Sequence, residues 1–197
     1  MPKLGMEPIR RAALVEATIH EIGVVGTLDV TVSRIAKRAG MSSALAHHYF
    51  GSKDQIFMAA MRHTLTVYGA EVRGALSMTK TPLERATAII RTSFSAMNFR
   101  SEVVAAWLNF YVLAQTHPEA NKLLRIYQAR LRSNLTHAMR PLIGARAAAS
   151  ADRIAALIDG LYLRHTLGGT SPNPEDPVAV ALGLLAQELE GGGRDAG

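Results

Sequence analysis

Apolar residues recur along this chain with the spacing of an α-helix rather than that of a strand. Gly26 stands where a helix over residues 7–25 would end, because glycine is common just past helix C-termini. No alternating run is long enough to predict a strand. The pattern therefore predicts an all-α protein of about nine helices. The apolar face of the first helix consists of Ala12, Val15, Ile19 and Ile22.

Several later helices have clear start signals. Thr81-Pro82-Leu83-Glu84 combines a cap, a proline at the first helical position and a glutamate that closes a capping box. Ser52 and Gln55 suggest the same arrangement at the start of a long helix that reaches about residue 78. Further helices are predicted to begin at Ser101, Pro118, Ser150 and Asp176.

Residues 31–53 have the pattern of a helix-turn-helix. Thr31 starts a short helix, Gly40 supplies a residue that tolerates positive φ, and Ser42 caps a second short helix. The apolar stripe of the first of these helices is Val32, Ile35, Ala36 and Ala39, which leaves Ser33, Arg34, Lys37 and Arg38 facing outward.

The second helix of this unit is predicted to tuck Leu45 and Tyr49 inward. A basic helical hairpin can also be an ordinary solvated corner of an all-α protein. The ordered sequence of cap, stripe, glycine, cap, short helix and aromatic pair favours binding to double-stranded DNA. The side chains that it presents to the major groove are Ser42, Ser43, Ala44, His47 and His48.

The positive charge is concentrated near the N-terminus. The chain has a formal net charge of +6. Residues 1–53 contain 7 basic and 4 acidic side chains, which suits phosphate binding. We expect a DNA-binding domain over 1–53, a ligand-binding and dimerisation domain over 54–190, and a flexible glycine-rich tail over 191–197.

The last two predicted helices are unusually apolar. Packing within one chain would explain such stripes, and so would a two-fold interface in which helix pairs form a four-helix bundle. A helix-turn-helix favours the second explanation, because pairing doubles the contacts with DNA. The stripes are Ile154, Leu157, Ile158 and Leu161 in one helix, and Val178, Leu182, Gly183 and Leu185 in the other.

Several function classes lack support in the sequence. There is no cysteine, no apolar segment of a signal peptide and no run long enough to span a membrane, so the cytoplasm is expected. Neither a glycine-rich phosphate loop nor a nucleophile motif is present, and the histidines lack metal-binding spacing. We expect no enzyme activity, no catalytic residue, no metal and no cofactor. The competing classes are a DNA-binding protein without an inducer and a protein of the membrane surface.

The helix-turn-helix, its aromatic pair Tyr49-Phe50 and the following Ser52-Lys53 resemble the TetR family of bacterial repressors. Further segments resemble the choline-responsive members of this family, which repress glycine betaine synthesis genes. These segments are MPKLGM with Ile9-Arg10-Arg11, His48-Tyr49-Phe50, Ala106-Trp107-Leu108 with Phe110, and residues 157–164.

The resemblance implies a homodimeric repressor that choline releases from operator DNA. It adds Thr31, Tyr49 and Lys53 as residues that hold the DNA backbone, beside the five groove-facing side chains named above. The alternatives are a repressor that responds to a different cationic or apolar compound and a DNA-binding protein that has no inducer.

A quaternary ammonium is held by aromatic faces and a nearby carboxylate. Trp107, Phe110 and Tyr111 fall together on one predicted helix, and Phe94, Tyr127 and Tyr162 lie on others. An aromatic cluster at helical spacing is more often part of the core than a ligand site. Asp159 is either the carboxylate partner of the ligand or a structural residue that pairs with Arg164, and we favour the second role. The expected ligand residues are Trp107, Phe110, Tyr111, Asp159 and Tyr162.

Overall fold

The computed structural model describes residues 5–167 and 175–191, and this part of the chain is helical without strands. The all-α prediction is confirmed. Most of the predicted tail, residues 192–197, lies outside the described residues. The helices are α1 (Met6–Val25), α2 (Val32–Arg38), α3 (Ser43–Phe50), α4 (Lys53–Ser77), α5 (Pro82–Ser93), α6 (Ser101–Leu113), α7 (Pro118–Ile143), a 3-10 turn η1 (Gly144–Arg146), α8 (Ala147–Leu167) and α9 (Glu175–Glu190).

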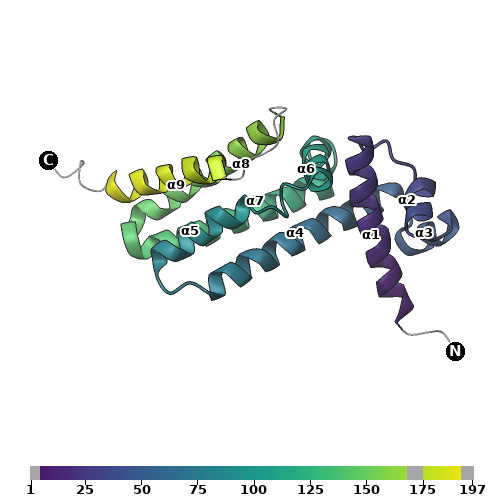
Figure 1. Ribbon diagram of the computed structural model, residues 1–197, viewed down its shortest axis with the longest axis horizontal. Coiled ribbons are helices and arrows are strands. Elements are labelled where there is room, and N and C mark those ends of the chain that lie inside the picture. Colours follow the sequence, from purple (N-terminus) through teal and green to yellow (C-terminus); the bar gives the residue numbers. More distant parts are fainter. Residues whose placement is uncertain (1–4, 168–174, 192–197) are drawn as a thin grey trace. The chain divides into compact units, whose positions relative to one another are not determined.

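The chain divides into two compact units. Unit 1 comprises residues 1–66 and 100–123, and unit 2 comprises residues 67–99 and 124–197. Helices α1, α2, α3 and α6 therefore belong to unit 1, whereas α5, α8 and α9 belong to unit 2 (Figure 1). The long helices α4 and α7 contribute residues to both units.

In unit 1, α2 packs on both α1 and α3, and α1 also packs on α6 (Figure 1). Gly23 lies where α1 meets α6. A Cβ atom at this position would lie 2.5 Å from the Cα atom of Glu102, so only glycine permits this approach. The side-chain amide of Asn109 on α6 donates to the carbonyl of Gly26, 2.9 Å away, and ties α6 to the end of α1.

The buried face of α1 differs from its prediction at one residue. Val15, Ile19 and Ile22 are buried as expected, but the prediction for Ala12 is wrong because this residue is exposed. The buried face centres on Leu14, and at 3.6 residues per turn Ala12 lies about 200° around the helix from it.

Unit 2 has one core of buried side chains from α4, α5, α7, α8 and α9. The capping box predicted at Thr81 is present: its hydroxyl accepts from the Glu84 amide at 3.2 Å, and the Glu84 carboxylate accepts from the Thr81 amide at 3.1 Å. The helix predicted to start at Ser150 begins three residues earlier, at Ala147. Ser150 is buried and its hydroxyl donates to Glu188 on α9, 2.6 Å away, so this side chain packs between helices and does not cap.

Candidate DNA interface and ligand site

The helix-turn-helix forms from the local signals that predicted it. The Thr31 hydroxyl accepts from the Arg34 amide at 3.2 Å and caps α2, and the Ser42 hydroxyl accepts from the Leu45 amide at 3.2 Å and caps α3. Gly40 has a φ of 68°, a conformation that residues with a side chain rarely adopt. These three residues fix the turn between α2 and α3.

Helix α3 presents the predicted surface with one change in its buried face. Leu45 and Tyr49 are only half-buried, and Ala46, which has no accessible surface, is the residue that contacts the core. A small residue lets α3 lie close to its neighbours. The side chains of Ser42, Ala44, His47 and His48 are exposed, and Ser43 is half-exposed.

His47 is oriented by the end of its own helix. Its Nδ1 lies 3.1 Å from the carbonyl oxygen of Gly51. Because a carbonyl can only accept, Nδ1 must be the donor, which leaves Nε2 of the neutral ring as an acceptor. An acceptor at this place suits a base amino group in the major groove.

The residues expected to hold the DNA backbone lie at the start of α2, on α3 and at the start of α4. The Tyr49 hydroxyl accepts from Arg10 on α1 at 3.4 Å, and the Arg11 guanidinium lies 5.7 Å from the centre of the Tyr49 ring. The ammonium of Lys53 lies 5.4 Å from the centre of the Phe57 ring at the start of α4. Tyr49 and Lys53 are therefore held by neighbours while remaining partly exposed.

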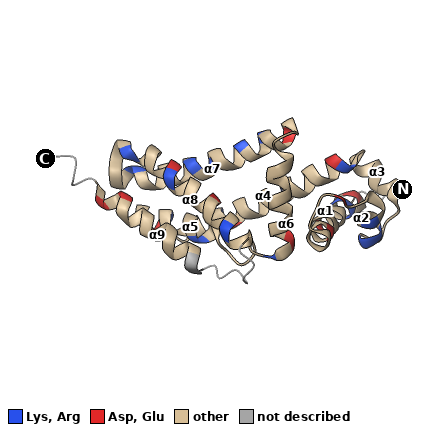
Figure 2. Ribbon diagram, turned by 90° about the horizontal axis from the view of Figure 1, so that it is seen from above, with Lys and Arg blue, Asp and Glu red and all other residues tan. Residues whose placement is uncertain are grey.

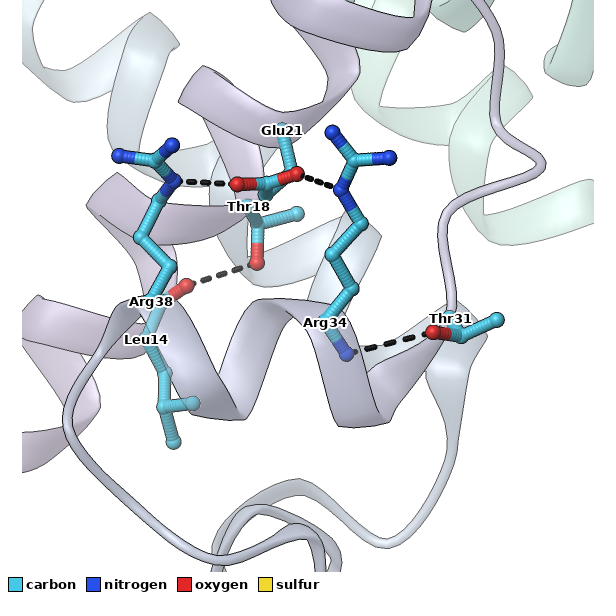
Figure 3. A network of polar contacts seen from close by, with 6 residues as sticks. All are labelled: Leu14, Thr18, Glu21, Thr31, Arg34 and Arg38. Atoms are coloured by element: carbon cyan, nitrogen blue, oxygen red, sulfur yellow. Dashed lines mark hydrogen bonds and ion pairs between the residues drawn. The ribbon is translucent and has the colours of Figure 1, made fainter.

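Helix α2 carries a feature that the sequence reasoning missed. Its seven residues include three basic and no acidic side chains (Figure 2). Arg34 and Arg38 both donate through Nε to Glu21 of α1, whose side chain is only 4% exposed (Figure 3). These bonds lower the pKa of Glu21 and keep its carboxylate charged, and the bond from Arg38 has the largest effect. A glutamate amid the apolar positions of α1 was the only sequence signal for this arrangement.

The residues expected to bind the ligand are divided between the two units. On α6 in unit 1, the Trp107 ring centre lies 5.9 Å from that of Phe110 and 5.7 Å from that of Tyr111. Trp107 and Phe110 are buried, and Tyr111 is half-buried. Asp159 and Tyr162 lie on α8 in unit 2.

Both α8 residues have hydrogen-bond partners. The Tyr162 hydroxyl donates to the carbonyl of Asn98 at 3.0 Å, and burial raises the pKa of this phenol. The Tyr127 hydroxyl donates to Asp159 at 3.2 Å, a partner that the sequence did not suggest.

The ring of Tyr127 also lies edge-on to that of Tyr68. Burial raises the pKa of Tyr68 to about 12, so Tyr68 remains a neutral phenol that hydrogen-bonds Ser93 at 2.9 Å.

Two properties of the described residues bear on other function classes. In the part of the chain that the structure describes, no helix has both the length and the apolar character needed to cross a bilayer. Within residues 5–167 and 175–191, no three histidine, aspartate or glutamate side chains gather as a metal site.

Comparison with known families gives two matches. Residues 14–60 match the model of the bacterial regulatory proteins of the tetR family. Residues 82–190 match the C-terminal model of the BetI-type transcriptional repressors. The proteins described by these two models are transcriptional regulators and not enzymes.

Curated relatives match over almost their full length. The chain is 50% identical to the HTH-type transcriptional regulator BetI of Brucella anthropi, over 97% of this chain and 99% of the relative. It is 47% identical to BetI of Rhizobium meliloti, over 98% of this chain and 96% of the relative.

Solved structures share the fold at lower identity. A transcriptional regulator from Pseudomonas aeruginosa PAO1 aligns with a TM-score of 0.82 at 24% identity, over 96% of this chain and 94% of that one. A regulator from Saccharomonospora viridis in complex with choline aligns with a TM-score of 0.79 at 20% identity, over 89% of this chain and 95% of that one.

Proposed function

Because the chain belongs to the TetR family of transcriptional regulators, with a BetI-type C-terminal region, we propose that it is a homodimeric repressor released from its operator by choline. We further propose that it controls genes of glycine betaine synthesis. The observation that carries the proposal is the capped helix-turn-helix with an exposed polar α3, in a chain 50% identical to a BetI regulator over nearly its whole length.

Choline is the inducer that the chemistry of the aromatic residues on α6 supports best. Its trimethylammonium group has no hydrogen to donate, so it binds to aromatic faces by cation–π attraction. Trp107 and Tyr111 stand one helical turn apart on α6 with their rings 5.7 Å apart. The choline complex of the Saccharomonospora viridis regulator adds support from a protein of the same fold. We propose that Trp107, Phe110 and Tyr111 contact the cation.

The α8 residues supply different groups, and their roles are proposed separately. Asp159 would provide the negative charge, and its bond from Tyr127 would fix the carboxylate. Tyr162 would contribute its ring, since its hydroxyl already donates to Asn98. Replacing Asp159 by Asn keeps the acceptor for Tyr127 but removes the charge, so it separates a role in cation binding from a role in packing.

Dimerisation is proposed through α8 and α9, which run side by side in unit 2 (Figure 1). The predicted stripes are only partly buried within one chain. Ile154, Ile158, Val178 and Leu185 are buried within one chain, which accounts for half of them. Leu157, Leu161, Leu182 and the exposed Gly183 keep surface that a second copy would cover.

The decisive experiment measures binding to DNA upstream of the chain's own gene and of glycine betaine synthesis genes, with and without choline. We expect tight binding that choline weakens. The matched control is 3,3-dimethyl-1-butanol, which replaces the quaternary nitrogen of choline by carbon and removes the charge. Equal release by this neutral analogue would contradict recognition of a cation.

Tryptophan fluorescence reports on the ligand site directly, because Trp107 is the only tryptophan. We expect choline to change this emission. The D159N variant removes the charge and the Y162L variant removes the ring, so their affinities for choline show whether α8 contributes to binding. Operator binding that ignores choline would favour the alternatives, another small molecule or no inducer. No binding to any of these DNA fragments would contradict the assignment of the operator.

A further inference from the structure

A buried carboxylate of α1 joins two arginines of α2. Glu21 has a side chain that is 4% exposed, and it accepts from Nε of Arg34 and Nε of Arg38. The two arginines are four residues apart and therefore lie on one face of α2, one turn after the other. Figure 3 shows them on either side of the Glu21 carboxylate.

The charges of this cluster do not cancel. A buried carboxylate requires partners, and one guanidinium would balance its charge. The second guanidinium leaves one positive charge in excess. The side chains of Arg34 and Arg38 are 49% and 40% exposed, so this excess charge faces solvent.

The guanidinium group can serve two acceptors at once. It carries five N–H donors in a rigid plane, and a phosphate accepts two of them side by side. In Figure 3 each arginine turns Nε toward Glu21, with one terminal nitrogen on the same edge of the group and the other pointing away from the carboxylate. Glu21 thus holds each arginine through Nε. The end of the guanidinium that carries the two terminal nitrogens can bind a phosphate.

The position of α2 indicates what that second acceptor is. In a helix-turn-helix the first helix crosses the DNA backbone while the second enters the groove. Thr31, at the start of α2, precedes Arg34 by one turn, and the exposed Lys37 lies between the two arginines. The Thr31 hydroxyl and three basic side chains are therefore exposed on the helix that crosses the backbone in this motif.

We propose that Arg34 and Arg38 bind phosphates of the operator and that Glu21 is the positioning residue that holds both guanidinium groups. This inference rests on operator binding through the helix-turn-helix. It adds two residues within α2 to the expected DNA contacts, which so far comprise Thr31 before α2, the residues of α3 and Lys53.

A structural role and the proposed role predict different effects of replacing Glu21 by Gln. The E21Q variant loses one negative charge near the DNA, and this rise in net charge alone would strengthen binding and steepen its salt dependence. Loss of the carboxylate also frees both arginines to move. If Glu21 positions them, E21Q binds DNA several-fold more weakly despite its higher net charge.

The test uses a random duplex as well as the operator, because phosphate contacts do not depend on sequence. Affinity is measured by fluorescence anisotropy over a range of salt concentrations. We expect R34A and R38A each to weaken binding to both duplexes and to reduce the salt slope by about one unit. We expect R34K to bind more weakly than the wild type at the same net charge, because one ammonium cannot both hold Glu21 and grip a phosphate in a fork.

The matched control is R62A. Arg62 on α4 has a side chain that is 51% exposed and pairs with Glu119 at 3.5 Å, but it lies outside the helix-turn-helix. This variant removes the same charge and should leave the salt slope unchanged. Circular dichroism establishes that each variant is folded. If the E21Q variant does not fold, the R34K variant still tests the proposal.

Three outcomes would overturn the inference. The first is a salt slope that is unchanged in both R34A and R38A, and the second is a slope that R62A reduces as much as the α2 variants do. The third is an E21Q variant that binds DNA more tightly than the wild type. A wild-type protein that binds no operator would instead contradict the proposed function.

Discussion

At the scale of single residues, Glu188 of α9 shows how one side chain can hold two helices together. It accepts from Nε and Nη2 of Arg153, each 2.5 Å away, and from the hydroxyl of Ser150, so three donors of α8 converge on it. The bond from Arg153 is the main cause that lowers the pKa of Glu188 from 4.5 to about 2.

This lowered pKa predicts how stability depends on pH. The folded-state pKa lies below the unfolded value, so the charged form stabilises the fold above about pH 4.5, and the contribution is lost as the pH falls toward 2. We expect E188Q to lower the free energy of unfolding at pH 7 by about 1.5–3 kcal/mol, the contribution of hydrogen bonds to a charged group. Urea unfolding between pH 7 and pH 3 measures this difference, which should shrink at the acidic end.

The control for this prediction is E190Q, at an exposed position of the same helix. It should change the free energy of unfolding by less than about 0.5 kcal/mol. A deficit in E188Q that stays constant across the pH range would mean that the charge of Glu188 is not its source.

At the scale of helices, the contact of α1 with α6 depends on the absence of a side chain at Gly23. A Cβ atom there meets the backbone of Glu102, which cannot move aside as the end of a flexible side chain can. We expect G23A to destabilise unit 1 by about 1–3 kcal/mol, the usual cost of overpacking. Thermal or urea unfolding measures the change.

Gly74 on α4 provides the matched control. A Cβ atom at this exposed helical position would have no atom within 4 Å. Alanine forms helices better than glycine, so G74A should stabilise the protein by up to about 1 kcal/mol. Equal effects of the two substitutions would contradict the close approach of α1 and α6.

The proposed DNA contacts of α3 and of the start of α4 should also behave differently. Lys53 is proposed to bind a phosphate and not a base, so K53A should weaken binding to all duplexes and reduce the salt slope by about one unit. His47 faces outward from α3 with Nε2 as an acceptor, so H47A should change the preference among operator variants. Anisotropy titrations with a panel of mutated operators separate the two effects. Equal losses by H47A on operator and random DNA would remove its role in base recognition.

The helices themselves were largely predictable because their boundaries depend on local chemistry. The Thr81–Glu84 box, the capping hydroxyl of Ser42 and the positive φ of Gly40 each need only neighbours within a few residues. The start of α8 was not predictable, because Ser150 bonds to Glu188, 38 residues away.

The candidate site was predictable only in part, for the same physical reason. The exposure of His47 and His48 follows from the period of α3. The bonds from Arg34 and Arg38 to Glu21 join two helices, and so does the bond from Tyr127 to Asp159, across 32 residues. Periodicity places a residue on a face of its helix but does not identify the partner on the next one.

At the scale of the whole molecule, the proposed function requires two copies of the chain. One α3 of eight residues reads few base pairs, and pairing doubles both the base and the phosphate contacts. Gly183 on α9 is the most direct place to test the pairing. It is exposed, and a Cβ atom there would meet nothing within 4 Å in its own chain.

Replacing Gly183 by Glu should therefore leave the fold of one chain unchanged while placing two carboxylates against each other in a two-fold interface. We expect sedimentation to show monomers at concentrations where the wild type is dimeric, with a large loss of operator affinity. The control A96E adds the same charge at an exposed position between α5 and α6 and should stay dimeric. A G183E protein that remains dimeric and binds operator normally would exclude this face of α9 from the interface, because a buried pair of like charges cannot be accommodated without cost.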